Sequence, residues 1–256
     1  MDLGLAGKVA LVTGGSRGIG KAIALGLAAE GASVFIVARG EEQLDETTRE
    51  IEKAGGVVRA AALDIATEAG AKAAVADAVS ELGGLDILVN NAGGSLGAGK
   101  FGDADGEAWR RVVDLNLMSA VWCSQAALRA FEARGGGVIV NVSSICGLEY
   151  CSSAPYQAAK GAIAALTKEM GIDLAKKKVR VVAVAPGSIM FPGGSWDKRR
   201  QTMPERIEKM IQEDLPWGRF GTPEEIADVV VFACSSRASW VTGSSIVVDG
   251  GQMRGM

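Results

Sequence analysis

Residues 9–20 of this 256-residue chain read VALVTGGSRGIG: an apolar run of strand length, a glycine-rich turn and the start of a helical pattern. Glycine allows the backbone to turn tightly and to approach a ligand. The helix that such a turn opens presents unpaired N–H groups and the positive end of its dipole, which favour a pyrophosphate. Any tight strand–helix turn uses glycine, so the position after a first strand is what favours dinucleotide binding.

The same alternation of strand and helix continues along the chain. Further apolar runs of strand length occupy residues 34–37, 57–63, 86–89, 138–142, 179–184 and 246–248. Helical patterns lie between them, for example at about 109–131, and a Pro/Gly-rich loop with two short helices precedes the last run. Near-continuous apolar strands separated by helices indicate a parallel sheet covered on both faces. We therefore predict an α/β fold, a doubly wound sheet of about seven strands, in a single domain over residues 1–256.

Composition narrows the class of function. A hydrophobic fraction of 48% with 22% charged residues is typical of a soluble globular protein, and a net charge of −3 gives no general attraction to nucleic acid. The N-terminal residues form no long apolar segment, so we expect no signal peptide, no membrane anchor and a cytoplasmic protein. The chain has no histidine. This absence excludes Ser-His-Asp and Cys-His catalysis and argues against a zinc site, so we predict no metal and proton chemistry by tyrosine, lysine or carboxylates.

Tyr156 and Lys160 lie four residues apart in the stretch APYQAAK, residues 154–160. Pro155 suits a first helical turn, and the apolar residues that follow have helical spacing: Ala159, Ile163, Leu166, Met170 and Leu174. A positive charge about 5 Å away, at an effective dielectric of roughly 20, lowers a phenol's pKa by roughly two units. We predict a tyrosine poised for proton transfer near neutrality, with a surface pair as the alternative.

The end of the second strand bears on the cofactor. A site for NAD usually has an acid there for the ribose hydroxyls, whereas this chain has Ala38-Arg39. Arg39, with Arg17 in the glycine turn, suits a 2′-phosphate because its planar fork donates several hydrogen bonds. We predict NADP(H) rather than NAD(H), although Glu41 or Glu42 would offer an acid for the ribose.

Several separated motifs then follow in order. They read Thr13-Gly14-x-x-x-Gly18-x-Gly20, Asp64-Ile65, Asn90-Asn91-Ala92-Gly93, Asp114-Leu115-Asn116-Leu117, Asn141-Val142-Ser143-Ser144-Ile145-Cys146-Gly147, Tyr156-x-x-x-Lys160, Pro186-Gly187 and Val241-Thr242-Gly243 through Asp249-Gly250-Gly251. In this order they resemble the short-chain dehydrogenase/reductase family, in the compact subgroup that includes 3-oxoacyl-[acyl-carrier-protein] reductases. The resemblance runs from about residue 7 to 251 and implies a Rossmann-type fold.

The resemblance also implies roles for individual residues. The catalytic residues would be Asn116, Ser144, Tyr156 and Lys160. The cofactor-binding residues would be Gly14, Ser16, Arg17, Gly18, Ile19, Gly20, Arg39, Asp64, Ile65, Asn91, Ala92, Gly93, Tyr156, Lys160, Pro186, Gly187, Ser188 and Ile189. Tyr156 would give a proton to a carbonyl oxygen while a nicotinamide delivers hydride. Lys160 would lower the tyrosine pKa, and Ser144 would hydrogen-bond the substrate oxygen.

Three assignments have alternatives. Asn116 would hold a water that links Lys160 to solvent, but a buried amide satisfying helix backbone is a serious alternative. Ser144 lies three residues before Gly147, as the catalytic serine does in the family. The spacing from Ser144 to Tyr156 is one residue shorter than the family commonly has, and this spacing would select Ser143 instead. Many relatives carry a threonine near position 191 that binds the cofactor carboxamide. In this chain Ser188 would take its place.

The segment 188–215 would form a lid over the substrate. Its Phe191 and Trp196, with Tyr150, suggest an apolar or ring-shaped substrate, or else they pack the lid closed. Cys146 and Cys151 have no evident base or metal partner, so we interpret them as packing residues.

The sequence thus predicts an NADP(H)-dependent oxidoreductase that interconverts a carbonyl and a secondary alcohol, with a 3-oxoacyl thioester as the nearest substrate class. The alternatives are a dehydrogenase of a sugar, steroid or xenobiotic, and a non-catalytic NADP(H)-binding sensor or scaffold. An enoyl reductase of related fold would carry lysine at position 163, where this chain has Ile163. We expect a small-molecule substrate, no nucleic acid or membrane partner, and a homotetramer built through the helices near 107–134 and 155–176.

Overall fold

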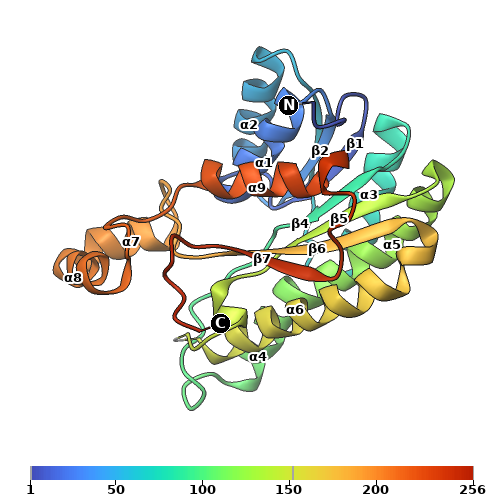
Figure 1. The fold of residues 1–256 in the computed structure, drawn as a ribbon. Coiled ribbons are helices and arrows are strands. Elements are labelled where there is room, and N and C mark those ends of the chain that lie inside the picture. Colours follow the sequence, from blue (N-terminus) through green and yellow to red (C-terminus); the bar gives the residue numbers. More distant parts are fainter. Residues whose placement is uncertain (1, 152, 256) are drawn as a thin grey trace.

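The computed structural model describes residues 2–151 and 153–255 (Figure 1). Within that part of the chain, seven strands form one parallel sheet in the order β3-β2-β1-β4-β5-β6-β7. The strands are β1 (Val9–Thr13), β2 (Ser33–Ala38), β3 (Val57–Ala62), β4 (Ile87–Asn90), β5 (Gly137–Val142), β6 (Val179–Pro186) and β7 (Ser244–Val248). The order reverses direction between β1 and β4, which is the doubly wound arrangement. The predicted fold class is confirmed.

Helices cover both faces of the sheet (Figure 1). One layer contains α1 (Gly18–Ala29), α2 (Glu41–Lys53) and α9 (Pro223–Cys234), and the other contains α3 (Glu68–Leu82), α4 (Gly106–Val113), α5 (Ser119–Arg134) and α6 (Ala154–Asp173). Successive side chains of a strand point to opposite faces, so Leu11 and Val12 enter different cores. This burial on both sides is why the strands are apolar almost throughout.

Helix α6 begins as the sequence predicts, with Pro155 in its first turn. The helix expected near 109–131 is instead interrupted, because a π-helical turn at Asp114–Met118 separates α4 from α5. The stretch after β6 contains three helices rather than two short ones: α7 (Ser195–Thr202), α8 (Pro204–Asp214) and α9. Helix α9 starts with a capping box in which Thr222 accepts from the Glu225 amide and the Glu225 side chain accepts from the Thr222 amide.

Helices α7 and α8 stand apart from the two layers, on the left of Figure 1. They gather around a small apolar cluster of their own, in which Ile207, Leu215 and Phe220 are buried. These helices fall in the segment predicted to form a lid. No helix in the described ranges combines the length and the apolar character needed to span a bilayer.

Candidate active site

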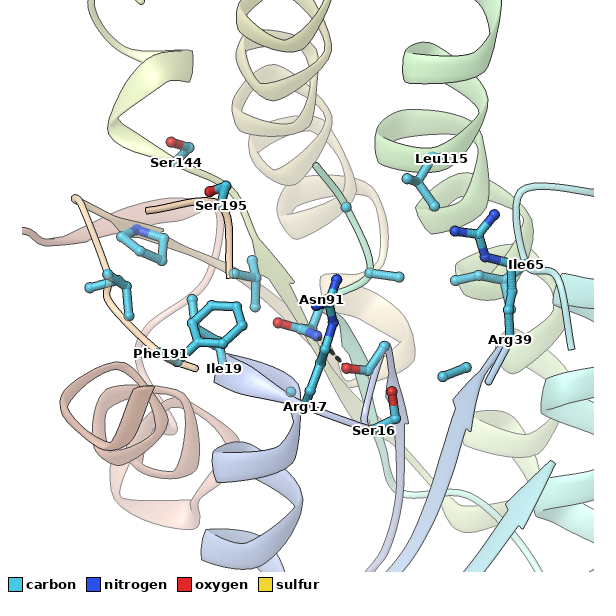
Figure 2. A pocket seen from close by; sticks show the side chains of 18 of the residues that line it. Ser16, Arg17, Ile19, Arg39, Ile65, Asn91, Leu115, Ser144, Phe191 and Ser195 are labelled. Atoms are coloured by element: carbon cyan, nitrogen blue, oxygen red, sulfur yellow. Dashed lines mark hydrogen bonds between the residues drawn. The ribbon is translucent and has the colours of Figure 1, made fainter. Parts of the chain in front are cut away.

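A cleft of about 630 Å³ opens where β1, β2, β4, β5 and β6 end. In an open α/β sheet, ligands bind beyond the carboxyl ends of the strands, where the strand order reverses. Residues from well-separated parts of the chain meet there, as Figure 2 shows for Arg17, Arg39, Asn91 and Ser144. The cleft therefore lies where the predicted dinucleotide site should be.

The glycine turn after β1 packs against the residues that follow β4. Gly14 has a φ of +65°, and a Cβ there would approach the Asn91 amide nitrogen to 3.0 Å. The Asn91 side-chain amide donates to the carbonyl oxygens of Thr13 and Gly14, at 2.8 and 3.2 Å. The Thr13 hydroxyl accepts from the backbone of Asn91 and Ala92, at 2.9 and 3.0 Å. These bonds fix the turn against the residues that follow β4 and give Asn91 a supporting role.

The two predicted phosphate-binding arginines both line the cleft and are exposed. Arg39 follows β2 and lies in the lining with Asp64 and Ile65, the residues that follow β3. Arg17 donates from Nη1 to the carbonyl oxygen of Gly193 at 3.1 Å, so it connects the glycine turn to the segment before α7.

Lys160 lies buried in the lining of the same cleft. Its side chain, in a residue only 3% exposed, donates from Nζ to the Val142 carbonyl oxygen at 2.7 Å. Burial lowers the Lys160 pKa to about 8 from its ordinary value of 10.5, because the charged form loses its hydration. The ammonium lies 5.7 Å from the centre of the Tyr156 ring. The two residues thus face one another, as their spacing on α6 predicts.

The predicted direction of the Tyr156 pKa is wrong for the protein alone. Burial raises this pKa above its ordinary value, and a hydrogen bond from Ser144 opposes the rise only in part. Loss of solvent around the phenol dominates this pKa, and the Lys160 ammonium donates to a backbone carbonyl rather than to the phenol.

The two neighbouring serines have different partners. The Ser143 hydroxyl donates to the Lys160 carbonyl oxygen at 3.2 Å and so binds the backbone of α6. The Ser144 hydroxyl accepts from the Cys146 amide at 3.1 Å, at the start of the 3-10 turn Ile145–Gly147. Ser144 also lines the cleft with Tyr156 and acts to lower the Tyr156 pKa. Ser144 is therefore the serine beside Tyr156. The local motif predicts this serine, whereas the number of residues between serine and tyrosine would select Ser143.

Asn116 lies in the π-helical turn and is 2% exposed. Its amide nitrogen donates to the carbonyl oxygens of Gly94 and Val112, at 2.9 and 2.8 Å, and its oxygen accepts from the Gly94 amide at 2.9 Å. A Cβ on Gly93 would lie 2.6 Å from this oxygen and 3.1 Å from the Lys160 nitrogen. The side chain thus positions the loop after β4 beside Lys160, in line with the alternative of a buried, satisfied amide.

The structure corrects the expectation for Ser188, whose hydroxyl does not face the cleft. It accepts from the Gln252 side-chain amide at 3.0 Å, while the Ser188 backbone N–H donates to the Gln252 oxygen at 2.8 Å. Ser188 instead lines a separate cavity of about 270 Å³. In extended backbone alternate residues point to opposite sides, so Gly187 and Ile189 face the cleft and Ser188 faces away.

The aromatic residues of the predicted lid are packed. A Cβ on Gly18 would lie 2.6 Å from the Phe191 ring, so this ring covers the first residue of α1. The Trp196 ring packs against Phe220 at 5.4 Å between centroids, with the two rings tilted by 49°. Both Phe191 and Trp196 also line the cleft, whereas Tyr150 is 78% exposed to solvent. The packing interpretation therefore accounts for Phe191 and Trp196.

Among the described residues, most of the predicted site lines this cleft; Gly18, Asn116 and Ser188 lie outside the lining. The cleft is also lined by Ser143, Phe191 and Trp196, which the sequence analysis names as alternatives or lid residues. Further lining residues were not predicted: Val37, Ala38, Gly40, Gln43, Leu63, Leu115, Val142 and Ser195. Several of them end a strand or follow it directly, a position that the apolar runs already mark in the sequence.

The known proteins to which this chain is similar are dehydrogenases and reductases. A family model described as enoyl-(acyl carrier protein) reductase matches residues 14–253. The chain is 39% identical over 249 residues to 2-(S)-hydroxypropyl-CoM dehydrogenase 3 of Xanthobacter autotrophicus, covering 96% of this chain and 97% of that protein. It is 36% identical over 251 residues to 7alpha-hydroxysteroid dehydrogenase of Escherichia coli, with coverage of 98% and 96%.

Solved structures agree with these relatives. The crystal structure of L-sorbose reductase from Gluconobacter frateurii, complexed with NADPH and L-sorbose, superposes with a TM-score of 0.95 at 37% identity and covers 100% of both chains. A 7 alpha-hydroxysteroid dehydrogenase complexed with NADH and 7-oxo glycochenodeoxycholic acid superposes with a TM-score of 0.91 at 36% identity, covering 99% of this chain and 97% of that one.

Proposed function

This chain belongs to the short-chain dehydrogenase/reductase family of oxidoreductases, and on that premise we propose that it interconverts a ketone and a secondary alcohol with NADP(H). One observation carries the proposal: Ser144, Tyr156 and Lys160 line the same cleft as Arg17 and Arg39. A group for proton transfer and a pair of cations for a phosphate therefore share one cavity.

The residues of the cleft fit a dinucleotide. The bare backbone of the glycine turn and the start of α1 would receive the pyrophosphate, because a side chain at Gly14 or Gly20 would collide with neighbouring atoms. Arg39 and Arg17 would hold the 2′-phosphate of NADP(H). The related structures contain either NADPH or NADH, so the preference rests on these arginines and on the lack of an acid at positions 38 and 39.

When bound, the nicotinamide supplies or accepts the hydride. Tyr156 gives its proton to the carbonyl oxygen in reduction and takes it back in oxidation. Ser144 hydrogen-bonds the same oxygen and stabilises the charge that develops there. Lys160, with a pKa of about 8, remains charged at neutral pH and would offset the negative charge on a Tyr156 phenolate. Asn116 keeps the loop after β4 in contact with Lys160.

Burial keeps Tyr156 protonated in the protein alone, so the residue is available as an acid. An alkoxide is far more basic than a phenolate, so proton transfer from Tyr156 to a forming alkoxide is downhill even when the tyrosine pKa is high. Oxidation instead needs the phenolate as the base.

We propose a ketone of small to medium size as the substrate. The named relatives are dehydrogenases or reductases of 2-(S)-hydroxypropyl-CoM, a hydroxysteroid or L-sorbose, which supports the sugar, steroid or xenobiotic class over the 3-oxoacyl thioester. Although the matching family model is described as an enoyl reductase, position 163 holds Ile163 rather than the lysine expected for such an enzyme. A cytoplasmic homotetramer and a substrate lid over residues 188–215 complete the proposal.

Replacement of Tyr156 by Phe tests the proposed acid. Removal of a general acid lowers kcat by about 10²–10⁴-fold, while NADPH binding should stay near that of the parent protein. The measurement is NADPH oxidation against a panel of ketones and acyl thioesters, with cofactor affinity from fluorescence. Ser144→Ala should also lose most of its turnover and the matched Ser143→Ala should retain much more. Substantial turnover by Tyr156→Phe would remove this residue from its role.

The same panel separates an enzyme from a sensor. NADPH binding without turnover of any ketone in the panel would support the alternative of a non-catalytic NADP(H)-binding protein. Turnover that requires Tyr156 would exclude it.

Replacement of Arg39 by Asp tests the cofactor. Loss of charge-assisted bonds worth about 1.5–3 kcal/mol should change the NADPH/NADH ratio of kcat/KM by roughly ten- to a hundredfold in favour of NADH. Arg49→Asp is the matched control, because Arg49 is an exposed arginine of α2 outside the cleft lining. An unchanged ratio in Arg39→Asp would overturn the choice of NADP(H).

A further inference from the structure

The residues that follow β7 return to the site and contact two of its segments. The backbone turns back at Gly250 and Gly251, which have φ values of +62° and +77°. The Asp249 carboxylate accepts from the backbone amides of Gly251 and Met253, at 2.9 and 2.7 Å. This carboxylate therefore fixes the bend of residues 249–254, which we call the C-terminal strap.

Gln252 of the C-terminal strap binds Ser188, in the turn after β6, through two hydrogen bonds. The Gln252 side-chain oxygen accepts from the Ser188 amide at 2.8 Å, and the Gln252 side-chain nitrogen donates to the Ser188 hydroxyl at 3.0 Å. Ser188 is only 8% exposed and Gln252 is half-buried, so water competes little for these bonds. One side chain therefore holds both the backbone and the hydroxyl of Ser188.

The turn and the C-terminal strap approach one another closely at Gly187. A Cβ on Gly187 would lie 2.7 Å from the Asp249 Cβ and 2.9 Å from the Gln252 side-chain oxygen. The Gly187 amide also donates to the Val248 carbonyl oxygen at 3.0 Å. The turn after β6 is thus held by the last residue of β7 and by the strap that follows it.

These contacts determine which residues the turn presents to the cleft. Alternate residues of extended backbone point to opposite sides, so a Ser188 held against the strap directs Gly187 and Ile189 into the cleft. Both of these residues belong to the predicted cofactor site. Gln252 lies outside the cleft lining in the described ranges, so its effect on a ligand passes through the turn.

The other end of the C-terminal strap contacts the loop after Ser144. The Arg254 amide donates to the Glu149 side-chain oxygen at 3.1 Å. The Glu149 amide donates to the Ile145 carbonyl oxygen at 2.9 Å, and Ile145 follows Ser144 directly. The strap therefore connects the turn of the predicted cofactor site with the loop of the serine that is proposed to bind the substrate oxygen.

We propose that the C-terminal strap positions both reactants, the cofactor through Gln252 and the ketone through Glu149. Gln252 is a positioning residue, because it fixes the turn at 187–189 without touching a ligand itself. Glu149 is the second positioning residue, because it joins the strap to the loop that begins with Ser144. The inference rests on the proposed function in that the cleft has to bind NADP(H) and a ketone, whereas the contacts of the strap are independent of it.

Hydrogen exchange of the full-length protein, without any ligand, tests the contact between Gln252 and Ser188. In Gln252→Met the side chain keeps its length but loses both hydrogen bonds, so the Ser188 amide should exchange faster than in the parent protein. The amides of Gly187 and Met190 donate to backbone oxygens and should keep their protection. Mass spectrometry with fragmentation to single residues measures these rates. Equal exchange at Ser188 in both proteins would overturn the role of Gln252.

The Kd for NADPH, measured by fluorescence, tests the positioning of the turn. Gln252→Met removes two hydrogen bonds to Ser188, so we expect its Kd to rise roughly tenfold. Gln252→Glu offers one oxygen to the Ser188 amide and the other to the Ser188 hydroxyl, which then donates, so its Kd should stay within about threefold of the parent value. An unchanged Kd in Gln252→Met, or an equal rise in Gln252→Glu, would contradict the proposal.

Ser188→Ala separates this indirect effect from a direct contact between Ser188 and the cofactor. The variant loses the bond at the hydroxyl and keeps the bond between Gln252 and the Ser188 amide, so its Kd for NADPH should rise less than that of Gln252→Met. A larger rise in Ser188→Ala would show that the hydroxyl itself binds the cofactor and would overturn the role of Gln252. If Gln252→Met does not fold, Gln252→Ala takes its place with the same expected order.

Glu149→Ala tests the second contact of the C-terminal strap. Without the acceptor for the Arg254 amide, kcat/KM for a ketone identified in the panel should fall roughly three- to tenfold, while the Kd for NADPH stays at the parent value. Glu149→Gln keeps an acceptor and should retain the parent kcat/KM. Equal kcat/KM in Glu149→Ala and the parent protein would overturn the role of Glu149. Hydrogen exchange at Ser188 needs neither cofactor nor turnover, so failure of the proposed function and failure of the strap remain distinguishable.

Discussion

Lys160, which we propose supports proton transfer, is buried at a cost in stability. It is buried, and its hydrogen-bond partner is a carbonyl oxygen rather than a carboxylate, so its pKa falls to about 8. At neutral pH the folded protein holds a charge whose hydration is lost. Residues that are unfavourable for folding and favourable for reaction are common in active sites.

This burial predicts a pH dependence of stability. Between pH 8 and about 10.5 the unfolded chain keeps the Lys160 proton that the folded chain has lost, so the free energy of unfolding gains from this group as pH rises. Below pH 8 both states are charged and the contribution is constant. Lys160→Met removes the titration. The parent protein should therefore gain stability relative to this variant from pH 7 to pH 10, by at most about 3 kcal/mol.

Urea unfolding of both proteins at several pH values measures this difference. The comparison with Lys160→Met cancels the titration of the other lysines and of the cysteines. A difference between the two proteins that is independent of pH would show that Lys160 does not have a lowered pKa.

At the scale of elements, the site depends on a close crossing between α6 and the 3-10 turn Ile145–Gly147. A Cβ at Gly147 would lie 2.6 Å from the carbonyl carbon and oxygen of Lys160, which are backbone atoms that cannot rotate away. The turn carries Ser144 at its start, and α6 carries Tyr156. The glycine therefore sets the distance between the serine and the tyrosine.

Replacement of Gly147 by Ala tests this crossing. We expect kcat/KM to fall by at least tenfold, because the turn and Ser144 must move away from α6. Gly161→Ala is the matched control: its Cβ would lie 3.4 Å from the Gly147 carbonyl oxygen, an ordinary contact. Alanine is also the better helix former by about 1 kcal/mol, so this variant should be active and no less stable. Equal activity of the two variants would contradict the argument.

The π-helical turn is the second element that shapes the site. It interrupts the helical run between α4 and α5 and places the Asn116 amide against Gly94. Such turns are rare and often lie at functional sites. Helical periodicity alone predicts one continuous helix there, because the π-helical turn follows α4 and precedes α5 without a gap in the chain.

At the scale of the whole molecule, several large apolar side chains of the protomer remain exposed. Trp240 is 99% exposed and Ile172, on α6, is 66% exposed. Exposed apolar groups of this size mark interaction surfaces when they cluster. Ile172 belongs to one of the helices predicted to build the tetramer.

We predict a homotetramer that depends on Ile172. Light scattering should give a mass about four times that of one chain, and Ile172→Glu should give smaller species because a charge replaces an apolar contact. Val57→Glu is the control, since Val57 is an exposed apolar residue of β3 outside both predicted interface helices. A monomeric parent protein would contradict the prediction, and a tetrameric Ile172→Glu would remove α6 from the interface.

The sequence by itself determined the alternation of strands and helices, the glycine turn and the i,i+4 pair of Tyr156 and Lys160. These features are local, because backbone sterics and side-chain periodicity set them within a few residues. Only the tertiary structure decided that Ser144 meets Tyr156, that Ser188 turns away to Gln252, and that burial raises the tyrosine pKa. Those outcomes depend on contacts between distant segments and on the solvent that packing removes, which no local pattern encodes.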